Sequence, residues 1–200
     1  MSPKSKRDLA LQRLYAHCAQ YGFKGVDNVS FITKAMGISR SLFYFYFADT
    51  EDLIRALAAF HKAKIDTRYA LAEEEKRDFL THIHALVEEK NNYFFTLQSV
   101  RHAHEHPLYR EMADYTLSTL DARNFREFIK HYQLSSFSES AIHFMYDSFR
   151  NFWFINSSYD NWSHERVDEM IAQIDVSIRL LKREELKKDD GEVAKEAQEG

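Results

Sequence analysis

The segment from 28 to 47, NVSFITKAMGISRSLFYFYF, constrains the fold more than any other part of the chain. Gly37 stands inside it, between two short stretches whose apolar residues have helical spacing. Asn28 and Ser39 each precede one stretch, and their side chains can accept a hydrogen bond from an otherwise unbonded N–H at a helix start. The segment therefore predicts two short helices separated by a tight turn.

Residues that interrupt helices are scarce in the whole chain. Its 200 residues include 5 Gly and 2 Pro. Turns and sheets use both residues heavily, so their scarcity favours long helices with short connections. A first helix is expected from about residue 7 to 21, ended by Gly22. We therefore expect an all-α fold of about nine helices, in which an N-terminal three-helix helix-turn-helix domain joins a larger helical domain.

The helices of the larger domain are expected at several places. Asp49 is a suitable cap for a helix that runs to about residue 72. The apolar spacing that begins at Phe79 predicts one helix that reaches a histidine-rich segment and stops before Pro107. One or two shorter helices are expected within 108–132.

The C-terminal third of the chain divides into apolar and charged parts. Two helices with wide apolar stripes are expected at about 137–157 and 164–184. The remaining residues, 185–200, are charged and nearly free of large apolar groups. We expect this tail to be disordered or only frayed helix.

Charge is distributed unevenly along the chain, whose net charge is −4. Residues 1–47 hold 7 of the 27 basic residues and 2 of the 31 acidic residues, which gives +5. The remainder holds 20 basic and 29 acidic residues, which gives −9. Phosphates respond to the local field rather than to the net charge, so the N-terminal part can bind nucleic acid.

A cytoplasmic location is expected. The single cysteine, Cys18, cannot form a disulfide within the chain, which suits a reducing compartment. The N-terminus lacks the continuous apolar stretch of a signal peptide, and no apolar run is long enough to span a membrane.

The stretch GFKGVDNVSFITKAMGISRSLFYFYFADTEDLIRAL resembles the DNA-binding domain of the tetracycline-repressor (TetR/AcrR) family. The matching features are Gly22-Phe23, Ile32, Gly37-Ile38-Ser39, Phe43-Tyr44, Tyr46-Phe47 and Glu51-Asp52-Leu53. The sequence departs from the family pattern at Phe31, Leu42 and Thr50, where the family commonly has a polar residue, a small residue and a phosphate-contacting Lys.

The resemblance implies a dimeric, ligand-responsive transcription regulator with three parts. Residues 1–47 would bind DNA, residues 48–184 would bind a ligand and dimerise, and 185–200 would be the tail. The protein would be a repressor, released from a near-palindromic operator by a small, largely apolar or aromatic ligand. The alternative is a DNA-binding protein of the same fold that needs no small ligand and acts through a protein partner or by organising DNA.

Contacts to DNA are expected along the second and third helices. Arg40 is the candidate for base readout, because residues at the start of this helix reach the major groove and Arg pairs bidentately with guanine. Its alternative roles are a phosphate contact or a solvated surface Arg. Phe45 either contacts thymine methyl groups or belongs to the core. The full set of expected DNA-binding residues is Asn28, Ser30, Ser39, Arg40, Ser41, Tyr44, Phe45, Tyr46 and Thr50.

A ligand pocket is expected in the helical domain because its aromatic content is high. A pocket lined by aromatic and a few polar groups suits an apolar or aromatic ligand. The alternative is a filled core without a cavity, because protein interiors are close-packed. The expected lining residues are Phe94, Gln98, His102, Tyr115, Phe125, Phe149 and Trp153.

Dimerisation is expected through the last two helices, at about 137–157 and 164–184. Two such helices from each subunit can form a four-helix interface. Two-fold symmetry would also place two recognition helices in successive major grooves, about 34–36 Å apart. The alternative is that these helices only close the core of their own subunit.

The histidines offer a possible metal site. His102 and His106 are four residues apart and, on a helix, could share a metal with Glu105 nearby. Isolated histidine pairs are much commoner than zinc sites, so we predict no metal and no cofactor. No nucleophile–base pair, paired carboxylates or glycine-rich phosphate loop stands out, and no catalytic residues are predicted. The histidines concerned are His82, His84, His102, His104 and His106.

Overall fold

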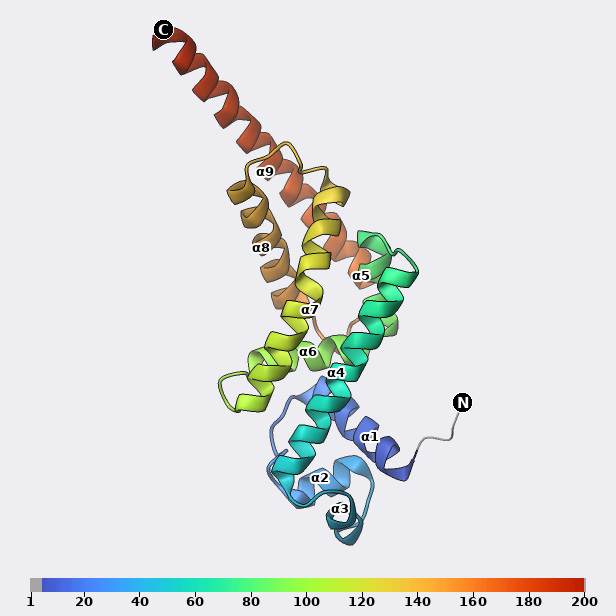
Figure 1. Ribbon diagram of the computed structural model, residues 1–200. Coiled ribbons are helices and arrows are strands. Elements are labelled where there is room, and N and C mark those ends of the chain that lie inside the picture. Colours follow the sequence, from blue (N-terminus) through green and yellow to red (C-terminus); the bar gives the residue numbers. More distant parts are fainter. Residues whose placement is uncertain (1–4, 200) are drawn as a thin grey trace. The chain divides into compact units, whose positions relative to one another are not determined.

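The computed structural model describes residues 5–199, and their side chains as far as residue 184. This part of the chain contains nine α-helices and no strand, which confirms the expected all-α class (Figure 1). In chain order the helices are α1 (Lys6–Tyr21), α2 (Val29–Met36), α3 (Arg40–Tyr46), α4 (Thr50–Glu74), α5 (Phe79–Glu88), α6 (Lys90–Arg101), α7 (Pro107–Tyr132), α8 (Glu139–Asn156) and α9 (His164–Glu199). None of these helices has the length and apolar character that a membrane crossing requires.

The helices form two compact units. Unit 1 contains the residues up to Arg77 together with Glu88–Ala122, and thus α1 to α4, α6 and the first part of α7. Unit 2 contains Asp78–Val87 and the residues from Arg123 onward, and thus α5, the rest of α7, α8 and α9.

The sequence-based division into 1–47, 48–184 and 185–200 is a division by role and stays a prediction. The tail expected at 185–200 falls in the last part of α9, where side chains lie outside the described residues.

The region between Phe79 and Pro107 differs from the sequence prediction. The single helix expected there is wrong, because α5 ends at Glu88 and α6 begins at Lys90. Glu89 has φ −96° and ψ 28° at this break, and its carboxylate lies 3.5 Å from Arg68 Nε and 3.7 Å from Arg77 Nη1. These ion pairs join residues far apart in sequence, so the local apolar spacing does not contain them.

Helix α7 is also longer than expected. One helix of 26 residues replaces the one or two shorter helices predicted within 108–132. Pro107 begins this helix, where its missing N–H has no partner to lose and its fixed φ suits the helix. The histidine-rich segment 102–106 is therefore the connection between α6 and α7.

The core of unit 1 is built around α1, which packs chiefly against α6 and α2. The ring of Tyr15 stacks on that of Phe95 with centroids 4.0 Å apart, and Phe23 stacks on Tyr109 at the same distance. Burial of side chains of this size contributes roughly 1.5–3 kcal/mol each. This core supports the short helices α2 and α3.

The core of unit 2 is largely aromatic. Phe149 contacts the rings of Phe79, Phe128 and Trp153, with centroids 5.4 to 5.8 Å apart. Trp162 meets Trp153 edge to face and donates a hydrogen bond from Nε1 to the Leu86 carbonyl oxygen at 3.2 Å. That hydrogen bond satisfies the one polar atom that the buried Trp162 ring carries.

Candidate nucleic-acid interface

The turn between α2 and α3 is closed by glycine and by an arginine from α1. Gly37 has φ +66°, in the left-handed region, and the Ile38 N–H donates to the Thr33 carbonyl at 3.0 Å. Arg13 Nη1 donates to the Met36 carbonyl at 3.3 Å. A Cβ on residue 37 would lie 2.6 Å from that Arg13 nitrogen. The backbone conformation therefore favours glycine, and any other residue would also displace the Arg13 guanidinium from its hydrogen bond.

The two expected caps are present. Asn28 Oδ1 accepts hydrogen bonds from the N–H groups of Ser30 and Phe31, at 2.9 and 3.3 Å. Ser39 Oγ accepts one from the Leu42 N–H at 3.2 Å. These bonds stabilise the starts of α2 and α3, so Asn28 and Ser39 act first as caps. Their expected contacts with DNA stay predictions.

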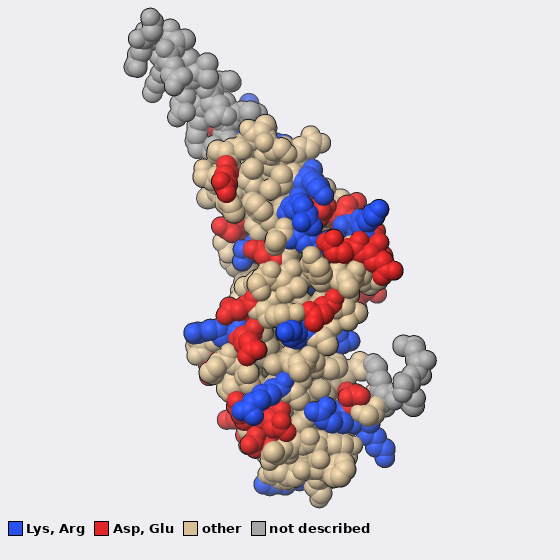
Figure 2. Space-filling model, in the orientation of Figure 1, with Lys and Arg blue, Asp and Glu red and all other residues tan. Residues whose placement is uncertain are grey.

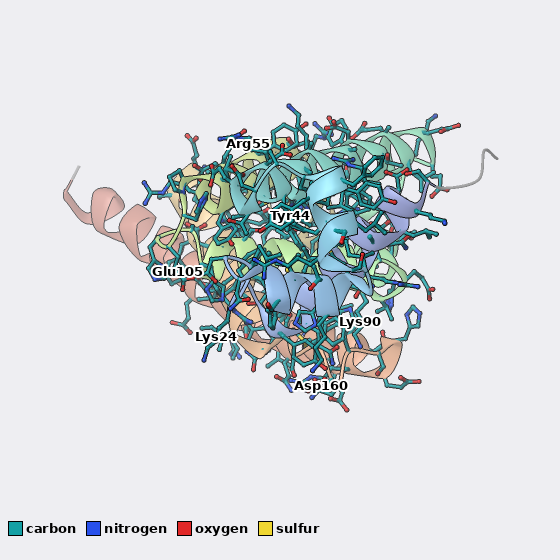
Figure 3. All side chains as sticks on the ribbon, turned by 90° about the horizontal axis from the view of Figure 1, so that it is seen from below. Lys24, Tyr44, Arg55, Lys90, Glu105 and Asp160 are labelled. Carbon is teal, nitrogen blue, oxygen red and sulfur yellow. The ribbon has the colours of Figure 1, made fainter. Side chains whose placement is uncertain are left out.

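Helix α3 has a buried face and an open face. Phe43 and Phe47, within and just after α3, are 0% and 1% exposed. Phe45, by contrast, is 80% exposed and Tyr44 is 49% exposed. The core role that the sequence allowed for Phe45 is therefore excluded. Figure 3 views the protein from the end of unit 1 that carries α3, and Tyr44 is labelled there on this helix.

The remaining residues of the open face are polar. Arg40 and Ser41 are exposed at the start of α3, and Tyr46 is half-buried at its end. The Arg40 guanidinium lies 5.8 Å from the centre of the Tyr44 ring, within range of a cation–π attraction. In Figure 2 the part of unit 1 where α2 and α3 lie is mostly uncharged on the face shown, and both basic and acidic side chains border it. The outward surface of α3 thus combines one cation with aromatic groups.

The structure shows the surroundings of two residues that depart from the family pattern, Phe31 and Thr50. The half-buried Phe31 ring meets His17 edge to face, with centroids 5.2 Å apart. A Cβ on Gly25 would lie 2.9 Å from the same Phe31 ring. Phe31 therefore packs α2 against α1 and the loop before it. Thr50 is the half-buried first residue of α4, directly after Asp49, whose carboxylate accepts the Asp52 N–H at 2.8 Å.

The residues expected to line a ligand pocket fall into both units. Unit 1 holds Phe94, Gln98, His102 and Tyr115. Unit 2 holds Phe125, which stacks on His143 at 4.6 Å, together with the buried Phe149 and Trp153. The predicted pocket as a whole stays a prediction.

Unit 1 contains two open clefts that sequence reasoning missed, of about 500 and 370 Å³. Tyr115 is the member of the predicted pocket that lines the smaller cleft. The larger one is lined by residues of α1, α4 and α6, among them Tyr15, Lys64, Arg68 and Asn92. These side chains come from distant parts of the sequence, so no local motif marks them.

The histidine-rich segment has a different arrangement from the one expected. His102 and His106 do not share a helix, because both lie between α6 and α7. His102 Nδ1 lies 2.8 Å from Glu105 Oε1, whereas His106 Nε2 lies 3.1 Å from Glu51 Oε2. Among the described residues, no three His, Cys, Asp or Glu side chains are grouped so that they could hold a metal ion.

Comparison with known proteins gives a structural match. No protein-family model matches this chain, and no curated protein does. A crystal structure assigned to a TetR-family transcriptional regulator from Rhodococcus sp. matches with a TM-score of 0.55. The match covers 88% of this chain and 100% of the other, at 16% sequence identity. At this identity the likeness concerns the fold, so the chain has the fold of a TetR-family transcriptional regulator. The resemblance predicted from the sequence is confirmed at that level.

Proposed function

We propose that this protein is a sequence-specific DNA-binding transcription regulator whose reading element is α3. The supporting observation is the two-sided character of that helix. Phe43 and Phe47 anchor it, while Arg40, Tyr44 and Phe45 stay open to solvent. A large apolar side chain exposed beside a cation suits the major groove, which presents thymine methyl groups beside guanine acceptors.

The exposed residues take distinct roles in this proposal. Arg40 pairs with guanine O6 and N7, and Phe45 contacts a thymine methyl group. Hydroxyl and amide groups at the starts of α2, α3 and α4 and along α3 contact phosphates, which set the position of the protein on the duplex. The proposed phosphate contacts are Asn28, Ser30, Ser39, Ser41, Tyr44, Tyr46 and Thr50.

The direct test is the affinity for duplex DNA as a function of salt, measured by fluorescence anisotropy. Affinity is expected to fall steeply as salt rises, because phosphate contacts release counterions. Phe45→Ala and Arg40→Ala should lower the preference for a selected sequence over random DNA. Arg110→Ala, an exposed position on α7, is the matched control and should leave that preference unchanged. Equal affinity for selected and random duplexes would overturn the proposal.

We further propose that the protein is a homodimer through α8 and α9, which correspond to the predicted helices at about 137–157 and 164–184. Each helix has large apolar side chains in the open. Phe144 and Ile155 of α8 are 61% and 76% exposed, and Val176 and Leu180 of α9 are 50% and 58% exposed. Burial of these groups against a second copy would remove apolar area from water. A two-fold dimer also supplies the two reading helices that a near-palindromic operator needs.

In the proposed mechanism a small, largely apolar or aromatic ligand acts as the signal for a cytoplasmic repressor. Ligand binding favours a spacing of the two reading helices that does not fit the groove, which is a shift between two populations. A crosslink that fixes this spacing is the test. A locked dimer should keep its DNA when ligand is added, and release of DNA from it would refute the mechanism.

A further inference from the structure

The larger cleft of unit 1, which we call the α1–α4–α6 cleft, has a wall formed by one face of a long helix. Phe60, Lys64, Thr67 and Leu71 recur on α4 at i, i+4, i+7 and i+11, and all of them line the cleft. Its volume of about 500 Å³ is that of a small-molecule site. The wall therefore offers an aromatic and aliphatic surface with a cation beside it.

The floor of the cleft is polar and buried. Tyr15, Arg68 and Asn92 line it, and each is less than a tenth exposed. The Tyr15 hydroxyl donates to Asn92 Oδ1 at 2.9 Å and lies 2.9 Å from His61 Nδ1. These bonds hold the floor in place before any ligand arrives, which reduces the ordering cost of binding.

The charges around the cleft favour an anion. Its lining contains three cations, Lys64, Arg68 and Lys90, and two carboxylates, Glu88 and Glu89. One of these carboxylates, Glu89, lies 3.5 Å from Arg68 Nε and 3.7 Å from Arg77 Nη1, so its charge is shared between an arginine of the lining and one outside it. Residues 89–92 form the start of α6, where the helix dipole adds positive potential.

The aromatic wall and the cations adjoin one another. Lys64 Nζ lies 5.4 Å from the centre of the Phe60 ring, and Phe60 meets Tyr15 edge to face at 5.2 Å. A planar ring placed along Phe60 would therefore bring a carboxylate attached to it close to Lys64, and Arg68 lines the same cleft about one turn of α4 further on. A charge-assisted bond to a partly desolvated cation is stronger than one between neutral groups.

We propose that the α1–α4–α6 cleft binds an aromatic carboxylate, with its ring along Phe60 and its carboxylate between Lys64, Arg68 and Lys90. Its regulatory consequence rests on the proposed DNA-binding function, whereas binding itself does not. Tyr15 belongs to α1, which packs on α2, and the wall belongs to α4. A ligand in the cleft would thus contact α1, which packs on α2, and α4, which follows α3 in the chain.

Isothermal titration calorimetry of the full chain with 1-naphthoate tests the proposal. Saturable binding of one probe per chain is expected. The neutral 1-naphthalenemethanol should bind about tenfold more weakly or worse, because it lacks the charge. Undetectable naphthoate binding, or equal binding of the neutral probe, would overturn the proposal.

Variants locate the site. Lys64→Gln with Lys90→Gln should weaken naphthoate binding by about tenfold. Thr67→Trp, at an exposed position of the wall, should abolish binding by filling the cleft. Lys62→Gln is the matched control, because Lys62 is exposed on α4 but lines the other cleft. Naphthoate binding that is unaffected by Thr67→Trp would place the probe elsewhere and refute the assignment.

The two proposals fail separately. A protein that prefers its selected DNA but does not bind naphthoate keeps the proposed function and loses the cleft assignment. A protein that binds naphthoate in the cleft but shows no DNA sequence preference keeps the cleft assignment and loses the proposed function. If both proposals hold, naphthoate should lower the affinity of the wild type for DNA and leave that of Thr67→Trp unchanged.

Discussion

Gly37 and Arg13 together determine the conformation of the turn before α3. For Gly37→Ala we expect a loss of about 1–2 kcal/mol in unfolding free energy, because a residue with a Cβ is strained in the left-handed region. The contact of the new Cβ with Arg13 Nη1 at 2.6 Å adds to this loss. The midpoint of chemical unfolding measures it.

The same substitution in an Arg13→Ala variant separates the backbone strain from the close contact with Arg13. In Arg13→Ala the close contact is absent, so Gly37→Ala should cost less there but still destabilise through its backbone strain. An unchanged unfolding midpoint for Gly37→Ala in the wild type would contradict the account of this turn.

In the proposed function, base readout depends most on Arg40. For Arg40→Ala we expect a loss of about 1–3 kcal/mol in binding free energy to the selected site, with relaxed preference at the base pair it contacts. The loss should be much smaller on random DNA, because phosphate contacts persist there. Competition between duplexes that differ at single base pairs is the measurement, and unchanged discrimination would remove Arg40 from the readout.

Local chemistry explains which single residues could be predicted. Asn28, Ser39 and Gly37 act within a few residues of their own positions, so the sequence contains the reason for each of them. Phe45 differs, because an aromatic residue at helical spacing suits either a core or a surface. Its exposure depends on the rotation of α3, which the burial of Phe43 and Phe47 sets.

At the scale of the helices, a buried hydrogen-bond network joins four elements of unit 1. His61 of α4 lies 2.9 Å from the Tyr15 hydroxyl of α1 and 2.9 Å from Thr116 Oγ1 of α7. Tyr15 also bonds to Asn92 of α6. Burial in this network lowers the pKa of His61 to about 4.

This pKa predicts a dependence of stability on pH. The unfolded chain binds a proton at His61 near the ordinary pKa of 6.5, whereas the folded chain binds it only near pH 4. Stability is therefore complete above about pH 6.5 and falls as pH decreases toward 4, by at most about 3 kcal/mol from this group. Chemical unfolding at a series of pH values measures the slope.

His61→Gln should reduce that slope, although it also lowers stability at neutral pH by disturbing the network. His104→Gln is the control, because His104 is largely exposed between α6 and α7. If His61→Gln and the wild type lose stability equally between neutral pH and pH 4, His61 is not the group responsible.

Helix boundaries show where sequence reasoning stops at this scale. The starts of α2, α3 and α4 were predictable from Asn28, Ser39 and Asp49, whose caps act locally. The break between α5 and α6 was not, because apolar spacing continues across it. That break occurs at Glu89, whose partners Arg68 and Arg77 are remote in sequence, and it separates helices of different units.

For the whole molecule, the central expectation is a dimer that forms independently of DNA binding. Phe144→Glu should convert the dimer to a monomer, because a carboxylate at this exposed α8 position would be desolvated in the interface. Light scattering coupled to size-exclusion chromatography gives the mass. Phe45→Ala removes another large exposed aromatic and should leave the mass unchanged. A monomeric wild type would refute the proposed interface.

The all-α fold of the chain was predictable because the scarcity of glycine and proline and the helical spacing of apolar residues both favour helices. The α1–α4–α6 cleft of unit 1 was not predictable, because Tyr15, Lys64 and Asn92 meet only after α1, α4 and α6 have packed. The uneven distribution of charge was visible in the sequence, but which side of α3 faces solvent depends on packing.

Selection of bound duplexes from random DNA, followed by sequencing, tests the central claim most directly. We expect enrichment of two inverted half-sites whose centres lie about 34–36 Å apart, since a two-fold dimer places its α3 helices in successive major grooves. Arg40→Ala should enrich a less restricted half-site with the same spacing. A pool that stays random while the protein binds it would contradict sequence-specific reading by α3.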